Sequence, residues 1–249
     1  MPRSTSKRLE LLRFLFLCLC LLGVLAGCSS SPKEEPQTAK LLLHWRLDDT
    51  QGQLVSDASG NEATGTASGT TWVKDGIAYL AFPSQGGVVR LREGAELDLP
   101  TDCTLAAWVR LGTVQSTQQL VRWGDSATCS LSWYVRWGEN RMAVVLEDNA
   151  RKVGYLSDTG VGTSGEWHHV AITRGASEIR FFVDGQEAGI AATTIGPCES
   201  NAGLTLGGTR AADGIEAAFI GGLADFRIYD GVCAPSEIAE LAKQALPET

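Results

Sequence analysis

Residues that could carry out covalent chemistry are few in this chain of 249 residues. The three histidines, His44 and the pair His168–His169, lie in runs typical of strands, so we expect them to pack rather than catalyse. Neither a Gly-x-Ser-x-Gly motif nor a phosphate-binding loop is present. Glu96 and Asp98 could flank a glycosidic bond, but a third acid is missing and a proline follows, which favours a solvated loop. The sequence therefore predicts a protein that is not an enzyme.

Tryptophans are the side chains best suited to bind a ligand, because an indole covers the apolar face of a sugar ring well. Trp133 and Trp137 lie on one face of an expected strand, about 13 Å apart. Trp123 is expected nearby. The alternative is that these side chains fill the core, since the seven Trp of one domain must mostly pack. We expect a ligand at Trp123, Trp133 and Trp137 if they are exposed.

The N-terminus has the pattern of a targeting segment. An apolar run from Phe14 to Leu25 follows several basic residues, and it is too short to span a bilayer comfortably. Leu-Ala-Gly-Cys then ends at Cys28 and resembles the bacterial lipobox, in which the cysteine becomes lipidated. The sequence predicts a signal peptide over 1–27, a lipid on Cys28 and a flexible tether over 28–40; an ordinary signal peptide that ends near a cysteine is the alternative. Ser29 resembles a signal for outer-membrane sorting, so we expect a lipid-anchored protein of the bacterial outer membrane.

The charge balance restricts the partners. The formal net charge is −8, and it falls to −11 without residues 1–27, which hold four of the 21 basic and one of the 29 acidic residues. Such a surface repels phosphate backbones, so a nucleic acid partner is not expected. It also gives no attraction to anionic lipid, so the membrane would be reached through the lipid anchor only.

The stretch from Gly165 to Gly185 has the clearest local structure. Two apolar and β-branched runs flank a short polar break, which indicates a pair of strands. Asp184-Gly185 suits a type I′ hairpin turn, because both central residues of that turn need a positive φ. Similar runs recur about every ten residues and predict further strands over 41–47, 72–82, 87–91, 103–111, 119–123, 129–137, 142–147, 204–208 and 219–229.

The motifs in these runs resemble a known family. Glu-Trp-His-His-Val-Ala, followed by Phe-Val-Asp-Gly, is similar to the central signature of laminin-G-like jelly-roll domains of the concanavalin A-like lectin/glucanase superfamily. The resemblance implies an all-β fold over 41–249: a two-sheet antiparallel jelly-roll sandwich with a short C-terminal helix that starts at Pro235. It also implies that Asp48, Asp57 and Asn61 lie near a structural calcium ion, although an Asx-turn that satisfies its own backbone would explain the same residues.

The same resemblance bears on the four cysteines of the expected domain. In the family, the strand with Trp108 lies antiparallel to the closing strand, which would bring Cys103 near Cys233 and predicts a disulfide between them. A second disulfide would then join Cys129 to Cys198, although four cysteines allow three pairings.

These expectations favour a non-catalytic binding module that recognises a glycan or a cell-surface protein partner. A glycan-active hydrolase or lyase of the same fold, or a purely structural envelope protein, are the alternatives.

Overall fold

The domain is built from two antiparallel sheets of eight strands each within the part of the chain that the structure, a computed structural model, describes. That part comprises residues 39–95, 97–98, 100–113, 116–125, 129–136, 138–195, 203–211, 214–244 and 246. The predicted signal peptide, Cys28 and nearly all of the tether lie outside it, as do Trp137 and Cys198. Within the described residues, no helix has the length and apolar character needed to cross a membrane.

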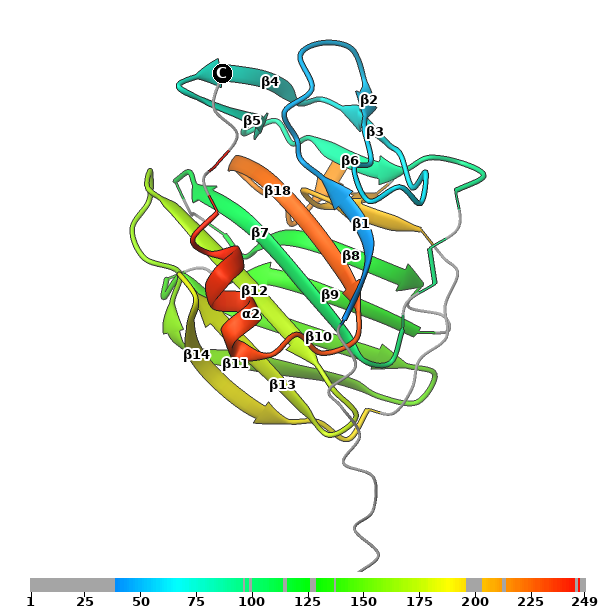
Figure 1. Cartoon of the computed structure of the whole chain (residues 1–249), viewed down its shortest axis with the longest axis vertical. Coiled ribbons are helices and arrows are strands. Elements are labelled where there is room, and N and C mark those ends of the chain that lie inside the picture. The colour runs from blue at the N-terminus through cyan, green and yellow to red at the C-terminus, as the bar shows by residue number, and fades with distance from the viewer. Residues whose placement is uncertain are drawn as a thin grey trace, which may run out of the picture. The chain divides into compact units, whose positions relative to one another are not determined.

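The first sheet follows the order β14-β13-β12-β7-β18-β5-β4, and β1 also pairs with β18. Its strands are β1 (Lys40–Trp45), β4 (Thr71–Asp75), β5 (Ile77–Phe82), β7 (Cys103–Leu111), β12 (Trp167–Arg174), β13 (Glu178–Val183), β14 (Gln186–Ala192) and β18 (Gly221–Asp230). The helix α2 (Pro235–Leu241) lies over the outer face of this sheet (Figure 1).

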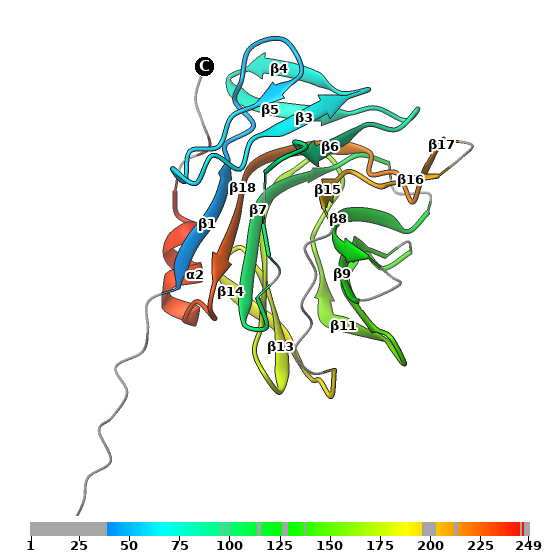
Figure 2. The ribbon, with the colours of Figure 1, turned by 90° about the vertical axis from the view of Figure 1, so that its right-hand side faces the viewer.

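The second sheet follows the order β11-β10-β9-β8-β15-β6-β3-β2. Its strands are β2 (Leu54–Val55), β3 (Gly65–Ser68), β6 (Val88–Leu91), β8 (Gln118–Asp125), β9 (Cys129–Val135), β10 (Arg141–Asp148), β11 (Lys152–Gly160) and β15 (Leu204–Leu206). A separate hairpin of β16 (Thr209–Ala211) and β17 (Gly214–Glu216) projects beyond this sheet (Figure 2).

The predicted all-β jelly-roll sandwich with a short C-terminal helix is confirmed. Strands distant in sequence lie side by side, since β7 pairs with both β12 and β18, and β15 inserts between β6 and β8. The hairpin turn is also as predicted, with φ of 50° at Asp184 and 76° at Gly185. The expected strand over 72–82 is instead a hairpin of β4 and β5, which turns at Gly76.

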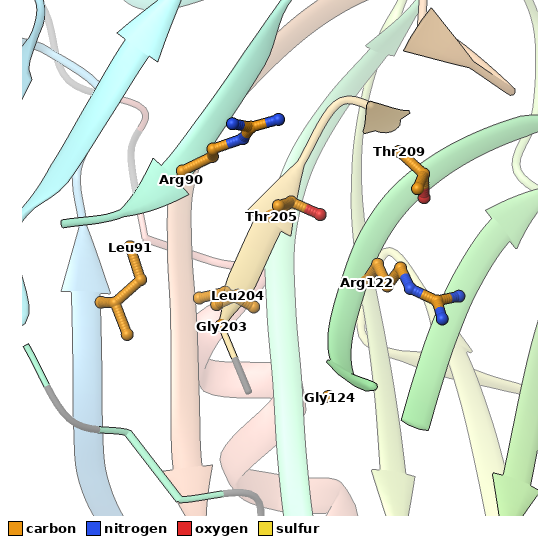
Figure 3. A pocket seen from close by; sticks show the side chains of 8 residues that line it. All are labelled: Arg90, Leu91, Arg122, Gly124, Gly203, Leu204, Thr205 and Thr209. Carbon is orange, nitrogen blue, oxygen red and sulfur yellow. The ribbon is translucent and has the colours of Figure 1, made fainter. Parts of the chain in front are cut away.

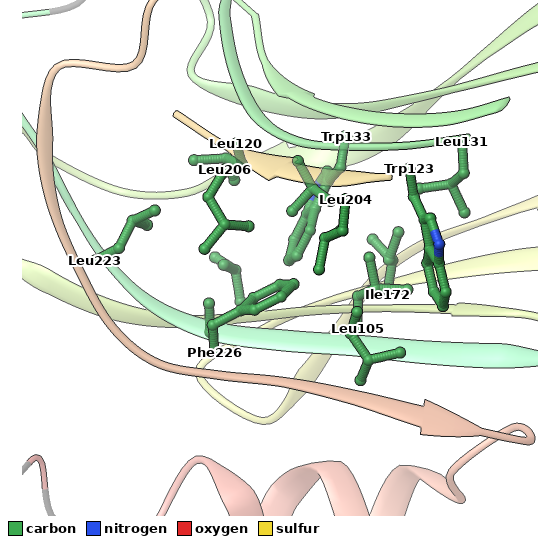
Figure 4. Packing of buried hydrophobic residues seen from close by; sticks show 14 of the residues in the cluster. Leu105, Leu120, Trp123, Leu131, Trp133, Ile172, Leu204, Leu206, Leu223 and Phe226 are labelled. Atoms are coloured by element: carbon green, nitrogen blue, oxygen red, sulfur yellow. The ribbon is translucent and has the colours of Figure 1, made fainter. Parts of the chain in front are cut away.

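The core lies between the two sheets and follows from the alternation of side chains along each strand. Leu105 and Ile172, which are cross-strand partners in the first sheet, face Trp133, Leu204 and other apolar side chains of the second (Figure 4). A smaller cluster on the outer face of the first sheet contains Phe182, Cys233 and Ile238, and holds α2 in place. The outer face of the second sheet carries no such helix in the described residues, and the side chains of Arg90 and Arg122 are partly exposed there.

A candidate binding pocket on the outer face of the second sheet

Four neighbouring strands of the second sheet carry one polar row across its outer face. Arg90 of β6 lies opposite Thr205 of β15, Thr205 lies opposite Arg122 of β8, and Arg122 lies opposite Ser132 of β9. The residues beside them in each strand are apolar and point into the core, as Leu204 does. Strand alternation therefore places two guanidinium groups and two hydroxyl groups on the same surface.

A pocket of about 310 Å³ opens along this row. Figure 3 shows the side chains of Arg90, Thr205 and Arg122 on one side of the sheet, and those of Leu91 and Leu204 on the other. The lining residues are Arg90, Leu91, Arg122, Gly124, Gly203, Leu204, Thr205 and Thr209. The two arginines are the only charged residues in this set, so the pocket is cationic although the chain as a whole is acidic.

Several donors in the pocket remain available to a ligand. Arg122 Nη1 donates a hydrogen bond of 3.3 Å to Ser132 Oγ, which orients the guanidinium group, and its other donors have no partner among the described residues. Arg90 has no ion pair or side-chain hydrogen bond with any described residue. The Thr205 hydroxyl oxygen is buried and has no hydrogen-bond partner there. An unpaired buried hydroxyl is unfavourable, and a ligand could bond to it only after the side chains that cover it move aside.

A series of hydrogen-bonded polar side chains borders the pocket on the side of the β16–β17 hairpin. Thr209 Oγ1 donates to Gln119 Oε1, and Gln119 Nε2 donates to the Tyr134 hydroxyl oxygen at 3.2 Å. Thr209 itself lines the pocket. Gln119 is 1% exposed, so these bonds hold its amide in one orientation and fix the position of the Thr209 hydroxyl.

The chemistry of this pocket is that of binding. The lining residues that the structure describes contain no Asp, Glu, His or Cys, so they offer neither the paired carboxylates of a glycosidase nor a nucleophile with its base. It does offer charge-assisted and neutral hydrogen-bond donors around a partly apolar floor, a composition typical of ligand sites.

The two described tryptophans of the predicted sugar platform are core residues, so that prediction is wrong. Trp123 and Trp133 are both 0% exposed, and Figure 4 shows them between the sheets. The Trp123 indole nitrogen donates to the Leu97 carbonyl oxygen at 3.2 Å. The parity of β9 is the reason, because Leu131, Trp133 and Val135 share the inner face. Trp137 lies outside the described residues.

The residues expected to bind calcium take part in bonds within the protein. Both carboxylate oxygens of Asp57 accept hydrogen bonds: Oδ1 from the backbone N–H of His44 and Ser59, and Oδ2 from the Ser59 hydroxyl and the Ala63 N–H. The bond from the Ser59 N–H is that of the alternative Asx-turn. Burial alone raises the pKa of Asp57, but these hydrogen bonds together hold it below its ordinary value.

The other two members of this set are also engaged. The Asn61 amide donates to the carbonyl oxygens of Leu41 and Leu42, and Asp48 forms an ion pair of 2.7 Å with Arg46. The described residues contain no group of three or more His, Cys, Asp or Glu side chains that could hold a metal. The arrangement does not fit a calcium ion shared by Asp48, Asp57 and Asn61, and calcium binding there stays a prediction to be tested.

Cys103 and Cys233 are free and buried, so the predicted disulfide between them is wrong. Cys103 lies opposite Asp230, close to the expected register, but its side chain enters the core between the sheets. Cys233 belongs to the cluster under α2, on the opposite face, where its N–H donates to Thr104 Oγ1 at 2.9 Å. Adjacent β7 residues point to opposite faces, which separates the two thiols. Cys129 is disulfide-bonded; its pairing with Cys198 stays a prediction.

Sequence reasoning missed Arg90 and Arg122. A usable signal was present, because each arginine interrupts an apolar run, and alternation directs its side chain to the face opposite that of the residues on either side. Val89 and Leu91 flank Arg90, and Val121 and Trp123 flank Arg122. The sequence alone could not show that β15, which begins some eighty residues after Arg122, inserts between these two strands.

A second hollow of about 350 Å³ lies elsewhere in the fold and contains two carboxylates, Asp98 and Asp230. Asn61 also lines it, together with apolar residues and Pro100. It is one described place for the alternative hydrolytic function, since Asp98 belongs to the acidic pair noted in the sequence.

Comparison with known proteins agrees with this architecture. A laminin-G family model, described as the concanavalin A-like lectin/glucanases superfamily, matches residues 83–239, which is more than half of the chain. The chain belongs to this superfamily. Its members share the sandwich described above, so the predicted family is confirmed.

One curated relative is neuronal pentraxin-2 of Cavia porcellus, which is 29% identical over 121 residues. The match covers 45% of this chain and only 27% of that protein, so the chain corresponds to a fraction of the relative's length.

Several solved structures share the fold. Domain 4 of AbnA, a GH43 extracellular arabinanase from Geobacillus stearothermophilus in complex with arabinotriose, has a TM-score of 0.66 and 18% identity, and covers 83% of this chain and 100% of that one. The receptor-binding domain of botulinum neurotoxin D has a TM-score of 0.61 and 11% identity, and covers 82% and 52%. At these identities the likeness shows the fold alone.

Proposed function

We propose that this chain is a non-catalytic glycan-binding module and that its ligand binds in the pocket around Arg90, Thr205 and Arg122. The observation that carries the proposal is this pocket itself: it opens on a sheet face, presents unpaired donors and contains no catalytic carboxylate among its lining residues. Hydroxyl-rich ligands such as sugars suit a surface that offers several fixed donors beside apolar atoms.

The proteins of similar fold support the same ligand class. The arabinanase domain was solved with arabinotriose, and for another similar structure, botulinum neurotoxin type C, cell entry depends on interaction with two ganglioside molecules. Both ligands contain sugar, and both proteins use the sandwich in a multidomain or toxin context. A protein partner is the runner-up, because the pentraxin relative matches this chain over 121 residues, which is 45% of its length.

A glycan array tests the proposal. The full chain, purified in detergent micelles, is expected to bind a restricted set of glycans, and Arg90→Gln is expected to reduce that signal. Incubation with the bound glycans should release no new reducing ends. Release of reducing ends that is lost in Asp98→Asn would favour the alternative function of a glycan hydrolase. The absence of any glycan signal would favour a protein partner or a structural role.

We further propose that the module is held at a bacterial outer membrane by a lipid on Cys28. The support is the Leu-Ala-Gly-Cys motif after an apolar run. Cys28→Ala should leave uncleaved precursor that a palmitate analogue does not label, whereas Cys18→Ala, a cysteine within the same segment, should be labelled normally. Labelling of the Cys28→Ala chain would contradict this.

A further inference from the structure

We infer that the pocket on the second sheet recognises the carboxylate of an acidic sugar, an inference that rests on the proposed glycan-binding function. The geometry that points to it is the placement of Arg90 and Arg122 on either side of Thr205, in one register row across β6, β15 and β8.

The spacing of the two arginines suits one small anion. Neighbouring strands lie about 4.8 Å apart, so the two Cα atoms are roughly 10 Å from each other with one strand between them. Arg122 is turned toward Ser132 of β9, so a change of its rotamer would be needed for both guanidinium groups to meet one group above Thr205. A guanidinium group binds a carboxylate through two parallel hydrogen bonds, so the pocket holds enough donors to saturate both carboxylate oxygens.

The charge of these arginines is not balanced within the described residues. Arg46, Arg141, Arg151, Arg180 and Arg227 each have a carboxylate partner. Arg90 and Arg122 are only partly exposed and have none, although acidic residues outnumber basic ones in the chain by 29 to 21. Two like charges in one partly buried pocket repel each other, and a bound anion removes that repulsion.

The rest of the pocket favours a sugar over a bare anion. Gly203 has no side chain, and no atom would lie within 4 Å of a Cβ placed there, so a ring can approach the backbone at that point. The Thr209 hydroxyl, which donates to Gln119, can still accept a bond from a ring hydroxyl group, and the buried Thr205 hydroxyl can do so once its cover moves aside. A volume of about 310 Å³ lies at the small end of ligand pockets and suits one ring of a longer chain. The acidic remainder of the protein opposes long polyanions, which favours a single acidic residue among neutral ones.

The test compares matched probes by calorimetry on the full chain in detergent micelles. The probes are oligosaccharides that contain galacturonate, glucuronate, mannuronate or sialic acid, each beside its methyl ester, and one sulfated oligosaccharide. At least one acidic probe is expected to bind about ten-fold or more tightly than its ester, with an affinity that falls as salt rises.

Four variants locate the effect. Arg90→Gln and Arg122→Gln should each weaken the preferred acidic probe by about ten- to a hundred-fold, and should leave the ester's affinity nearly unchanged. Arg46→Gln, an exposed arginine outside the pocket, is the matched control and should have no effect. Thermal melts by circular dichroism verify folding, and Arg90→Lys, which keeps the charge, should retain part of the preference if the glutamine variant is unstable.

The outcomes separate this inference from the function on which it rests. Equal affinity for acids and esters, acid binding that neither arginine variant weakens, or preference for the sulfated probe would overturn the carboxylate assignment while glycan binding stands. Failure of all probes, acidic and neutral, would remove the proposed function itself.

Discussion

Arg90 and Arg122 both lie opposite Thr205, one on each side of β15. The register therefore gathers three polar side chains from strands that are far apart in sequence, and it does so on the one broad sheet face that no described helix covers. Their inward-pointing neighbours belong to the core, so the pocket stands on a rigid floor. The backbone of such a site is set before a ligand arrives, which lowers the entropy that binding must overcome, although the Arg122 side chain has to leave Ser132.

The Thr205 hydroxyl should matter for binding and not for stability. Its oxygen is buried without a partner, which costs about 1–3 kcal/mol in the free protein. Thr205→Val keeps the β-branched shape, so the melting temperature should stay the same or rise slightly while glycan affinity falls several-fold. Thr71→Val, at an exposed position of β4 in the first sheet, is the matched control and should leave affinity unchanged. A clear loss of stability in Thr205→Val would contradict an unpaired hydroxyl.

The two free thiols should be inert in the folded protein. Burial raises the pKa of Cys103 to about 12 and that of Cys233 to about 11, and only the thiolate reacts with alkylating reagents. We expect no label on either residue in native buffer, and full labelling of both in guanidinium chloride without a reductant, read by peptide mass mapping. Labelling that requires prior reduction would restore the disulfide that the structure contradicts.

His169 should make the protein less stable in weak acid. Burial lowers its pKa from 6.5 to about 4, against the opposing influence of Asp225 and Asp184. The unfolded chain binds a proton here below about pH 6.5, whereas the folded chain does not until about pH 4, so the free energy of unfolding falls between these values. The full effect is about 3 kcal/mol.

Urea unfolding at several pH values measures this loss. His169→Phe keeps the edge-on ring contact with Trp108 and should flatten the curve between pH 6.5 and 4. Lys74→Gln, on an exposed position of β4, should leave the slope as it is. Carboxylates held at low pKa, such as Asp57, lose their contribution only as pH falls below about 3.8, so they do not mimic the effect. An unchanged slope in His169→Phe would show that another group is responsible.

Local signals in the sequence were strong enough to predict the fold. They were not strong enough to predict which side chains of a strand face the core and which face solvent. The hairpin at Asp184-Gly185 depends on residues that need a particular φ, and β7 is apolar along nearly its whole length because it is central. Alternation placed Trp133 and Tyr134 on opposite faces of their strand, but it could not tell which face is the core. That depends on the side on which the other sheet lies. The same ambiguity is the reason that the predicted disulfide was wrong: β7 and β18 pair nearly as expected, but Cys103 and Cys233 lie on opposite faces of the sheet. Arg90 and Arg122 needed the long-range insertion of β15, which local patterns do not contain.

Asp57 should stabilise the first loop without calcium. Its two oxygens together accept four hydrogen bonds from the protein, so Asp57→Ala should lower the free energy of unfolding by about 2–3 kcal/mol. Asp57→Asn should cost less, because one oxygen can still accept the bonds from the His44 and Ser59 N–H groups. Asp48→Ala removes only the surface ion pair with Arg46 and should cost less than about 1 kcal/mol.

The same variants decide the question of calcium. An ion that binds the folded state alone raises the melting temperature by mass action. Since protein donors already occupy the Asp57 oxygens, the unmodified chain should melt at the same temperature in millimolar calcium and in chelator. A rise with calcium that disappears in both Asp57→Asn and Asp48→Ala would show that the ion replaces these donors. The calcium site expected from the family resemblance would then be correct, and the hydrogen bonds around Asp57 would describe the metal-free state of the loop.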